Sequence, residues 1–295
     1  MPDGTVQDFE PHRRRLTGLA YRMLGSVAEA EDVVQDAWLR WHHADREGVR
    51  DSGAFLRRVV ARLCLDRLKS ARARRETYIG PWLPEPVLDI EALRAPPAGE
   101  WADDLSFALM LTLERLSPLE RAAFLLHDVF DMDFGEIATT LDRSEAACRQ
   151  LAARARAHVR AARPRFTIPA EQGERLVTAF LGAVQNGDTA TLARLLAEDA
   201  VLHTDGGGRR AAARNPIRGR DHILRMYAGL ARKSRLPRME AMVHPLRING
   251  LPGIIAIEPD GAMQAIAFEI AEERISAIYV VSNPDKLRHL ASLMR

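Results

Sequence analysis

The segment from Leu116 to Arg160 constrains the fold most, because its residue order is that of three consecutive helices. Ser117 supplies a capping hydroxyl, Pro118 suits a first helical position, and Glu120 places a carboxylate three residues after the cap. Apolar residues then recur at helical spacing on both sides of a tight turn, Leu141-Asp142-Arg143. The sequence therefore predicts a short helix, a turn and a longer helix, the geometry of a helix-turn-helix.

The longer helix is expected to begin at Ser144 and to concentrate positive charge on its outer face. From Arg143 to Arg165 there are seven arginines and one acid, Glu145. A solvated face usually mixes both signs, so this bias favours contact with DNA phosphates. Early residues of such a helix reach base edges, and later ones reach phosphates. We expect DNA contacts from Arg143, Glu145, Arg149, Gln150, Arg154, Arg156 and Arg160.

Length and composition are those of an ordinary protein of two or three domains. The chain has 295 residues and a net charge of +2, so a nucleic-acid footprint must come from uneven charge distribution. Its two cysteines, Cys64 and Cys148, lie in apolar helical patterns without metal-ligand spacing, which predicts buried thiols, no metal and no cofactor. No window is apolar enough to cross a bilayer, so we expect a cytoplasmic protein that does not bind membranes.

The N-terminal part, from Pro11 to about Arg75, has a helical pattern throughout. Ser26 and Glu29 have the spacing of a capping box that opens a helix. One face of this helix is apolar and carries two tryptophans. The opposite face is either simply solvated or a docking surface for a basic partner, and the pattern alone does not decide. That face carries Glu29, Glu31, Asp32, Gln35 and Asp36.

The next predicted helix, from Ser52 to about Arg75, carries a second basic patch in its distal half. Six cations there oppose one acid, Asp66. Because this patch is separate from the first, the chain is expected to hold DNA at two places. The cations are Arg62, Arg67, Lys69, Arg72, Arg74 and Arg75.

Between the two basic patches lies a segment with the composition of an extended linker. Residues 78 to 101 contain five prolines, and from Glu85 to Asp104 six acids oppose one arginine. Within the linker, Trp82-Leu83-Pro84-Glu85-Pro86 combines large apolar side chains with a stiff backbone. A simple spacer would leave the tryptophan and leucine side chains exposed to water without a function, so this string is expected to dock on another surface.

These features together resemble the extracytoplasmic-function sigma factors of bacterial RNA polymerase. The resemblance rests on Asp32-Val33-Val34-Gln35-Asp36-Ala37-Trp38, the basic helix with Asp66-Arg67, and the helix-turn-helix, in that order. It implies that Asp32, Gln35, Asp36 and Trp38 dock on the β′ clamp helices of core polymerase, whose β flap is a further partner. It also implies that Arg62, Arg67, Lys69 and Arg72 contact the promoter −10 element, and that the helix-turn-helix reads the −35 element. Arg62 departs from the asparagine of many members.

The third part, residues 169 to 295, has an α+β pattern. Helices are expected at about 171–185, 189–196 and 219–231, and strands at about 200–204, 239–248, 254–258, 263–270 and 275–281. Asn249-Gly250 and Asp260-Gly261 are turn signals between strands. Helices followed by a curled antiparallel sheet resemble the cone of nuclear-transport-factor-two-like and SnoaL-like proteins.

Two strings in this part strengthen the resemblance. Asp205-Gly206-Gly207-Gly208-Arg209 and Asn283-Pro284-Asp285-Lys286-Leu287, with the tryptophan string of the linker, resemble the signature of sigma factors with a fused SnoaL-like domain. The glycine run lacks the lysine of a phosphate loop and predicts a tight turn. The interdomain contacts implied are Trp82, Leu83, Pro84, Asp205, Gly206, Gly207, Asn283, Pro284, Asp285 and Lys286.

The sequence therefore predicts four segments and leaves more than one function open. They are sigma region 2 (1–77), a linker (78–102), sigma region 4 (103–168) and a SnoaL-like regulatory domain (169–295). The leading hypothesis is a non-catalytic sigma factor whose C-terminal domain responds to an unidentified small ligand or protein regulator. The alternatives are a ligand-sensing helix-turn-helix regulator, or a SnoaL-like cyclase or isomerase fused to a DNA-binding module. The residues that an enzyme pocket would use are His203, Asp205, His222 and Tyr227.

Overall fold

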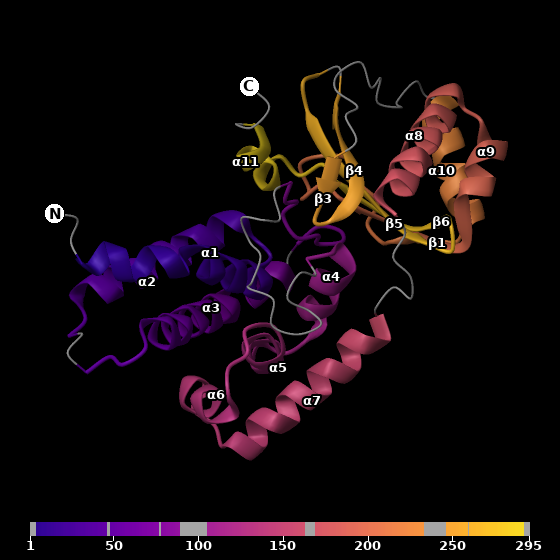
Figure 1. Cartoon of the computed structure of the whole chain (residues 1–295). Helices are drawn as coiled ribbons and strands as arrows, with labels where there is room; N and C mark the ends of the chain where they lie inside the picture. The colour runs from indigo at the N-terminus through magenta and orange to yellow at the C-terminus, as the bar shows by residue number, and fades with distance from the viewer. Residues whose placement is uncertain are drawn as a thin grey trace. The chain divides into compact units, whose positions relative to one another are not determined.

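The computed structural model describes residues 4–45, 48–76, 78–88, 105–162, 169–232, 246–258 and 260–291 (Figure 1). The chain forms two compact units. Unit 1 comprises residues 1–76 and 89–163, and unit 2 comprises residues 77–88 and 164–295. The first part of the expected linker thus belongs, by its contacts, to the C-terminal unit.

Unit 1 is built from helices, in agreement with the 3.6-residue periodicity of its sequence. Helices α1, α2 and α3 pack on one another, and α7 packs on α4, α5 and α6. The helical elements are α1 (Gly4–Leu24), α2 (Val27–His43), α3 (Ser52–Glu76), α4 (Phe107–Arg115), α5 (Pro118–Phe124), the π-helical turn η2 (Leu125–Val129), α6 (Phe134–Leu141) and α7 (Glu145–Ala162).

The predicted capping box is confirmed, but two helices differ from expectation. Ser117 accepts a hydrogen bond from Glu120 N at 3.3 Å, and Glu120 accepts one from Ser117 N at 3.1 Å. Helix α1 begins before Pro11, which lies inside it. The helix that Ser117 caps changes at Leu125 to π-helical bonding, in which Phe130 N donates to the carbonyl five residues back, at 3.0 Å.

Unit 2 combines helices with one six-stranded sheet of order β2-β1-β6-β5-β4-β3. The predicted α+β cone is confirmed. Its elements are α8 (Ala170–Asn186), α9 (Thr189–Leu195), β1 (Leu196–Asp205), β2 (Ile217–Arg218), α10 (Arg220–Arg232), β3 (Leu246–Ile248), β4 (Leu251–Ile257), β5 (Met263–Ala271), β6 (Arg274–Val281), the 3₁₀ turn η3 (Pro284–Lys286) and α11 (Arg288–Ala291).

The sheet is mixed, whereas the sequence analysis expected an antiparallel one. Strand β1 pairs parallel with β6, while the other neighbouring strands pair antiparallel. Strand β1 also starts earlier than expected, at Leu196, with an irregularity before Val201, and β2 was not predicted. Of the strand expected over 239–248, residues 239–245 lie outside the described residues.

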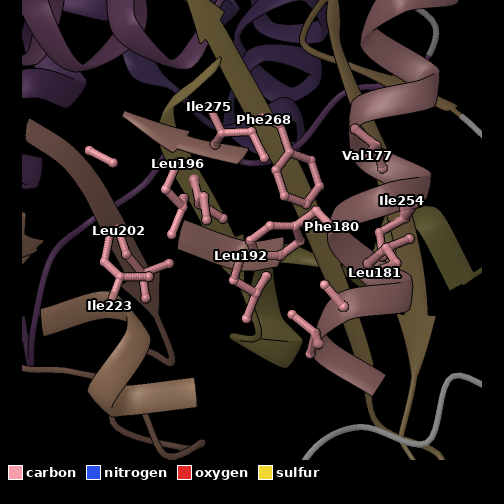
Figure 2. Packing of buried hydrophobic residues seen from close by; sticks show 14 of the residues in the cluster. Val177, Phe180, Leu181, Leu192, Leu196, Leu202, Ile223, Ile254, Phe268 and Ile275 are labelled. Atoms are coloured by element: carbon pink, nitrogen blue, oxygen red, sulfur yellow. The ribbon is translucent and has the colours of Figure 1, made fainter. Parts of the chain in front are cut away.

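The core of unit 2 is an apolar cluster between the helices and one face of the sheet (Figure 2). Phe180 of α8 lies at the centre, 5.1 Å from the ring of Phe268 on β5 and 5.6 Å from that of Tyr227 on α10. Leu192 and Leu202 complete the packing from α9 and β1. Side chains of α8, α9 and α10 therefore pack closely against this face of the sheet.

Candidate functional site

The helix-turn-helix of unit 1 consists of α6, a tight turn and α7. Asp133 caps α6 by accepting a hydrogen bond from Glu136 N at 2.8 Å. Asp142 ends α6 in the left-handed region with φ 54°, so the chain reverses within a few residues. Ser144 then accepts a hydrogen bond from Ala147 N at 3.3 Å and caps α7.

The N-terminal half of α7 presents exposed polar side chains. Arg143, Arg149 and Gln150 are all exposed. Arg149 pairs with Glu145 one turn earlier at 2.5 Å, and its guanidinium carbon lies 5.3 Å from the centre of the Phe134 ring. This pairing holds Arg149 beside the turn between the two helices.

The arginines in the C-terminal half of α7 differ in their exposure and in how closely they pair with acidic residues of unit 1. Arg156 is half-buried and pairs with Asp128 of η2 at 2.9 Å. Burial raises the pKa of the Asp128 carboxyl, and Arg156 opposes that rise. Arg154 pairs more loosely with Glu120, at 3.4 Å, and Arg160 is exposed. Arg160 is therefore better placed than Arg156 for a phosphate contact.

The basic residues of α3 make three kinds of contact. Arg67 pairs with Asp36 of α2 at 2.9 Å and with Asp32 at 3.6 Å, so it joins the two surfaces that the sequence analysis treated separately. Lys69 makes an exposed pair with Asp66 at 2.9 Å. Arg62 donates to backbone carbonyls of α6. Side chains of α3 after Lys69, including Arg72, lie outside the described residues.

The acidic face of α2 is exposed. The side chains of Asp32 and Asp36 are 68% and 47% accessible, and Gln35 is exposed beside them. Trp38 is half-buried and packs edge-on against Phe9 at 5.1 Å. Leu39, an exposed apolar residue on the same helix, was not predicted to belong to this surface.

A clamp in unit 2 holds the linker, and its centre is the carboxylate of Asp205. This side chain is fully buried at the end of β1. It accepts hydrogen bonds from Tyr78 Oη at 2.5 Å, Leu83 N at 2.8 Å and Gly207 N at 3.1 Å. It also forms an ion pair with Lys286 Nζ at 2.7 Å. The carboxylate thus binds the linker through a side chain and through the backbone.

Lys286 makes the second half of the clamp. Its ammonium donates to the carbonyl of Leu83 and lies over the rings of Trp82 and Tyr78, 4.2 and 4.9 Å from their centres. Asn283 donates from Nδ2 to Tyr78 Oη at 2.9 Å. Burial, and then the hydrogen bond to Asp205, raise the pKa of the Tyr78 hydroxyl above its usual range.

The far end of the held segment is bound by the turn between β3 and β4. Val87 N donates to Asn249 Oδ1 at 2.9 Å, and Asn249 N donates to the Val87 carbonyl at 2.8 Å. His289 Nε2 donates to the carbonyl of Pro86 at 2.8 Å. Tyr78, Asn249 and His289 were missed by the sequence analysis. Asn249 carried a signal for a turn only.

The glycine run after Asp205 is a tight turn, as predicted. The amides of Arg209 and Arg210 both donate to the carbonyl of Gly206 at 3.0 Å. A Cβ on Gly207, where φ is +60°, would lie 2.2 Å from Nδ2 of Asn283. Glycine is therefore required for the close approach to Asn283. Asp285 lies next to this turn, paired with Arg209 at 3.0 Å.

The residues considered for an enzyme pocket do not converge. Asp205 is occupied in the clamp, and His203 stacks on Tyr279, 5.3 Å between ring centres. His222 is exposed, whereas Tyr227 packs on Phe180 in the apolar core. Among the described residues there is also no group of three or more histidine, cysteine or acidic side chains that could hold a metal ion.

Matches to family models define the chain as a transcription initiation factor. Residues 9–74 match Sigma-70 region 2, residues 106–159 match Sigma-70 region 4, and residues 177–271 match the SnoaL-like domain. A chain with these domains binds core RNA polymerase and promoter DNA, and it is not an enzyme. None of the helices in the described ranges is both long and apolar enough to cross a membrane.

The chain belongs to the extracytoplasmic-function RNA polymerase sigma factors, with a SnoaL-like domain fused at its C-terminal end. It is 39% identical over 294 residues to the sigma factor SigJ of Mycobacterium tuberculosis, covering 95% of this chain and 92% of that protein. It is 32% identical over 283 residues to the probable sigma factor SigI of the same organism, covering 95% and 93%. The crystal structure of M. tuberculosis SigJ matches with a TM-score of 0.74 at 36% identity, covering 96% of this chain and 98% of that one.

The buried ion pair of the clamp makes a prediction about stability. Lys286→Met leaves the Asp205 carboxylate buried without its counter-ion, which should lower the free energy of unfolding of unit 2 by about 3–5 kcal/mol. Urea unfolding followed by tryptophan emission measures this change. Lys69→Met is the control, because it removes an exposed ion pair and should cost less than about 1 kcal/mol. Equal midpoints for the two variants would contradict a stabilising role for the clamp.

Proposed function

We propose that unit 2 regulates this sigma factor by holding the linker between regions 2 and 4. The observation that carries the proposal is the Asp205 carboxylate, which is buried and bound at once to Lys286, Tyr78 and the amide of Leu83. A domain with no functional connection to the sigma regions would not need hydrogen bonds from the linker to satisfy its own buried charge.

Holding the linker gives unit 2 a means of control. Regions 2 and 4 must occupy promoter elements at a fixed separation, and the linker is the chain that joins them. A clamp that favours one linker conformation changes the free energy of reaching that separation. A bias of a few kcal/mol is enough to switch the population between two states. A small ligand or protein regulator that binds unit 2 would act by tightening or loosening the clamp.

We also propose that the exposed face of α2 docks on the β′ clamp helices of core polymerase. Asp32, Gln35 and Asp36 supply acidic and polar contacts, and half-buried Trp38 supports the helix from beneath. Region 4 would in turn reach the β flap. Because the polymerase acts in the cytoplasm, we place the protein there.

For promoter DNA we assign two surfaces. The α3 residues Arg62, Arg67, Lys69 and Arg72 face the −10 element. The −35 element is read by Arg149, with Arg143, Glu145 and Gln150 beside it, while Arg154, Arg156 and Arg160 bind phosphates. The exposure of the first half of α7 supports base reading there.

Arg149→Ala and Arg160→Ala should separate base reading from phosphate binding. Arg149→Ala should cost about 1–3 kcal/mol on a −35 duplex and reduce discrimination against a scrambled duplex. Arg160→Ala should weaken binding to both duplexes alike, with a shallower salt dependence. Fluorescence anisotropy on the two duplexes measures both effects. If both variants lose the same affinity on both duplexes, the assignment of roles is wrong.

Asp32→Lys should weaken binding to core polymerase at least tenfold, which is about 1.4 kcal/mol. Asp32 is chosen because its distance to Arg67, 3.6 Å, is longer than that of Asp36, 2.9 Å. Exposed helix charges contribute little to stability, so the circular dichroism spectrum should be unchanged. Glu174→Lys, an exposed reversal on α8, is the control. Affinity equal to that of the wild type would exclude Asp32 from the docking surface.

Trp82→Ala should reduce transcription from a matched promoter without weakening core binding. Loss of the ring under Lys286 loosens the clamp, and a released linker must be ordered again when both promoter elements are occupied. Each 1.4 kcal/mol by which the substitution reduces the preference for the held linker conformation should lower the yield of promoter-dependent transcript about tenfold. Ile79→Ala is the control, because Ile79 is an exposed linker residue. Unchanged transcription in Trp82→Ala would leave unit 2 without a regulatory role through this segment.

A further inference from the structure

We infer that Phe134 is a positioning residue for promoter recognition. Its ring, packed against His127, holds the guanidinium of Arg149 so that the free donors of this group read a guanine in the −35 element. This inference deepens the proposed function and rests on the assignment of Arg149 to base reading. All the contacts that carry it lie within residues 127–149 of unit 1.

The Phe134 ring is the fixed part of the arrangement. Phe134 is the first residue of α6, and Asp133 caps this helix directly before it. The ring of His127, from the π-helical turn η2, packs against it with 4.1 Å between ring centres. His127 is itself held, because its Nδ1 donates to the carbonyl of Met132 at 2.9 Å. The aromatic surface beside the turn of the helix-turn-helix therefore has a defined position.

Arg149 lies against this ring with one of its donors occupied. Its guanidinium carbon is 5.3 Å from the ring centre, within the range of a cation–π contact. Within the residues that the structure describes, Glu145 is the only hydrogen-bond partner of the Arg149 side chain. A guanidinium has five N–H donors, so the other four remain for a ligand. The side chain is 57% accessible, so a ligand can reach them.

The two contacts lower the entropy that Arg149 loses when it binds DNA. An arginine in water populates many rotamers, and immobilising such a side chain at an interface subtracts from the binding free energy. Phe134 and Glu145 restrict the side chain before DNA arrives. Without the ring, the guanidinium would have to be ordered by the base alone.

The charge of Glu145 favours a base edge over a phosphate as the ligand of Arg149. The two side chains are 2.5 Å apart, so a phosphate bound to Arg149 would also be repelled by the carboxylate. A base edge is neutral. Among the bases, guanine presents two acceptors, O6 and N7, in the major groove, and they match two parallel N–H donors of one guanidinium. The ligand that fits Arg149 is therefore a guanine.

Substitution of single atoms in the DNA tests the guanine. Holoenzyme reconstituted from core polymerase and the full-length chain first selects its −35 sequence from duplexes randomised over that region. In the most enriched duplex, each guanine is replaced in turn by 7-deazaguanine, which keeps the base pair and lacks the N7 acceptor. One replacement should weaken binding of the wild-type holoenzyme about fivefold, which is about 1 kcal/mol, and leave binding of the Arg149→Ala holoenzyme unchanged. If no guanine distinguishes the two holoenzymes, the guanine assignment is overturned.

Fluorescence anisotropy on the same enriched duplex tests Phe134. Phe134→Leu keeps an apolar side chain and removes the ring face, so it should weaken binding about fivefold. In an Arg149→Ala background it should have no effect, because no guanidinium is left to position. Phe134→Tyr keeps the ring face and should bind as the wild type does. Equal losses from Phe134→Leu in both backgrounds, or no loss in either, would overturn the positioning role, since a ring that only stabilises region 4 acts independently of Arg149.

Two further comparisons complete the test. Phe55→Leu is the matched control, because it removes another half-buried ring of unit 1, which packs on Trp41, and it should leave binding to this duplex unchanged. Arg149→Ala separates the inference from the proposed function. If it binds the enriched duplex as tightly as the wild type, the assignment of Arg149 to the −35 element is itself wrong. If it loses affinity while Phe134→Leu does not, base reading stands and positioning by Phe134 is overturned.

Discussion

The burial of the Asp205 carboxylate is the constraint on which the second unit depends. A charged group without access to water costs several kcal/mol unless a counter-ion and hydrogen bonds replace the lost hydration. Lys286 supplies the counter-ion, and Gly207 N supplies one hydrogen bond from the domain itself. The remaining donors, Tyr78 Oη and Leu83 N, come from the linker. The linker thus completes the solvation of a charge that lies in the SnoaL-like domain.

This dependence explains why three strings far apart in the sequence occur together. The tryptophan string brings the ring of Trp82 and the backbone of Leu83, the glycine string brings Asp205, and the third string brings Lys286. Glycine follows Asp205 because a side chain at Gly207 would collide with Asn283. Each string supplies one part of a single polar site. Loss of the glycine string or of the third string leaves a buried charge without its counter-ion, and loss of the tryptophan string removes the Leu83 hydrogen bonds to both charges.

Local chemistry made much of this fold predictable from the sequence. The capping box at Ser117, the helix-turn-helix and the hairpin turn at Asn249 depend on neighbouring residues, and all three are present. The parallel pairing of β1 with β6 joins residues 76 to 79 positions apart and leaves no local pattern. The π-helical turn from Leu125 to Val129 has ordinary helical periodicity in its sequence, with Leu125, Leu126 and Val129 buried. Propensity therefore could not reveal either feature.

The candidate site was predictable to a similar, partial extent. Composition pointed to the arginines of α7 and to the tryptophan string, because a charge bias and exposed large apolar residues are visible in a sequence. The other two strings of the clamp were indicated by the resemblance to sigma factors with a fused SnoaL-like domain. Composition could not show that Val87 binds Asn249, since both of their hydrogen bonds involve backbone groups. The contact of Arg62 with α6 was hidden for the same reason. A guanidinium that binds a carbonyl leaves no complementary charge elsewhere in the chain.

Arg62 uses, for its contact with α6, the same group that the proposed contact with DNA requires. Its guanidinium donates to two carbonyls of α6, yet it lies on the basic helix assigned to the −10 element. A phosphate is a stronger acceptor for a guanidinium than a carbonyl is, because the phosphate carries a full negative charge and can accept two parallel N–H bonds. DNA therefore competes directly with α6 for this side chain.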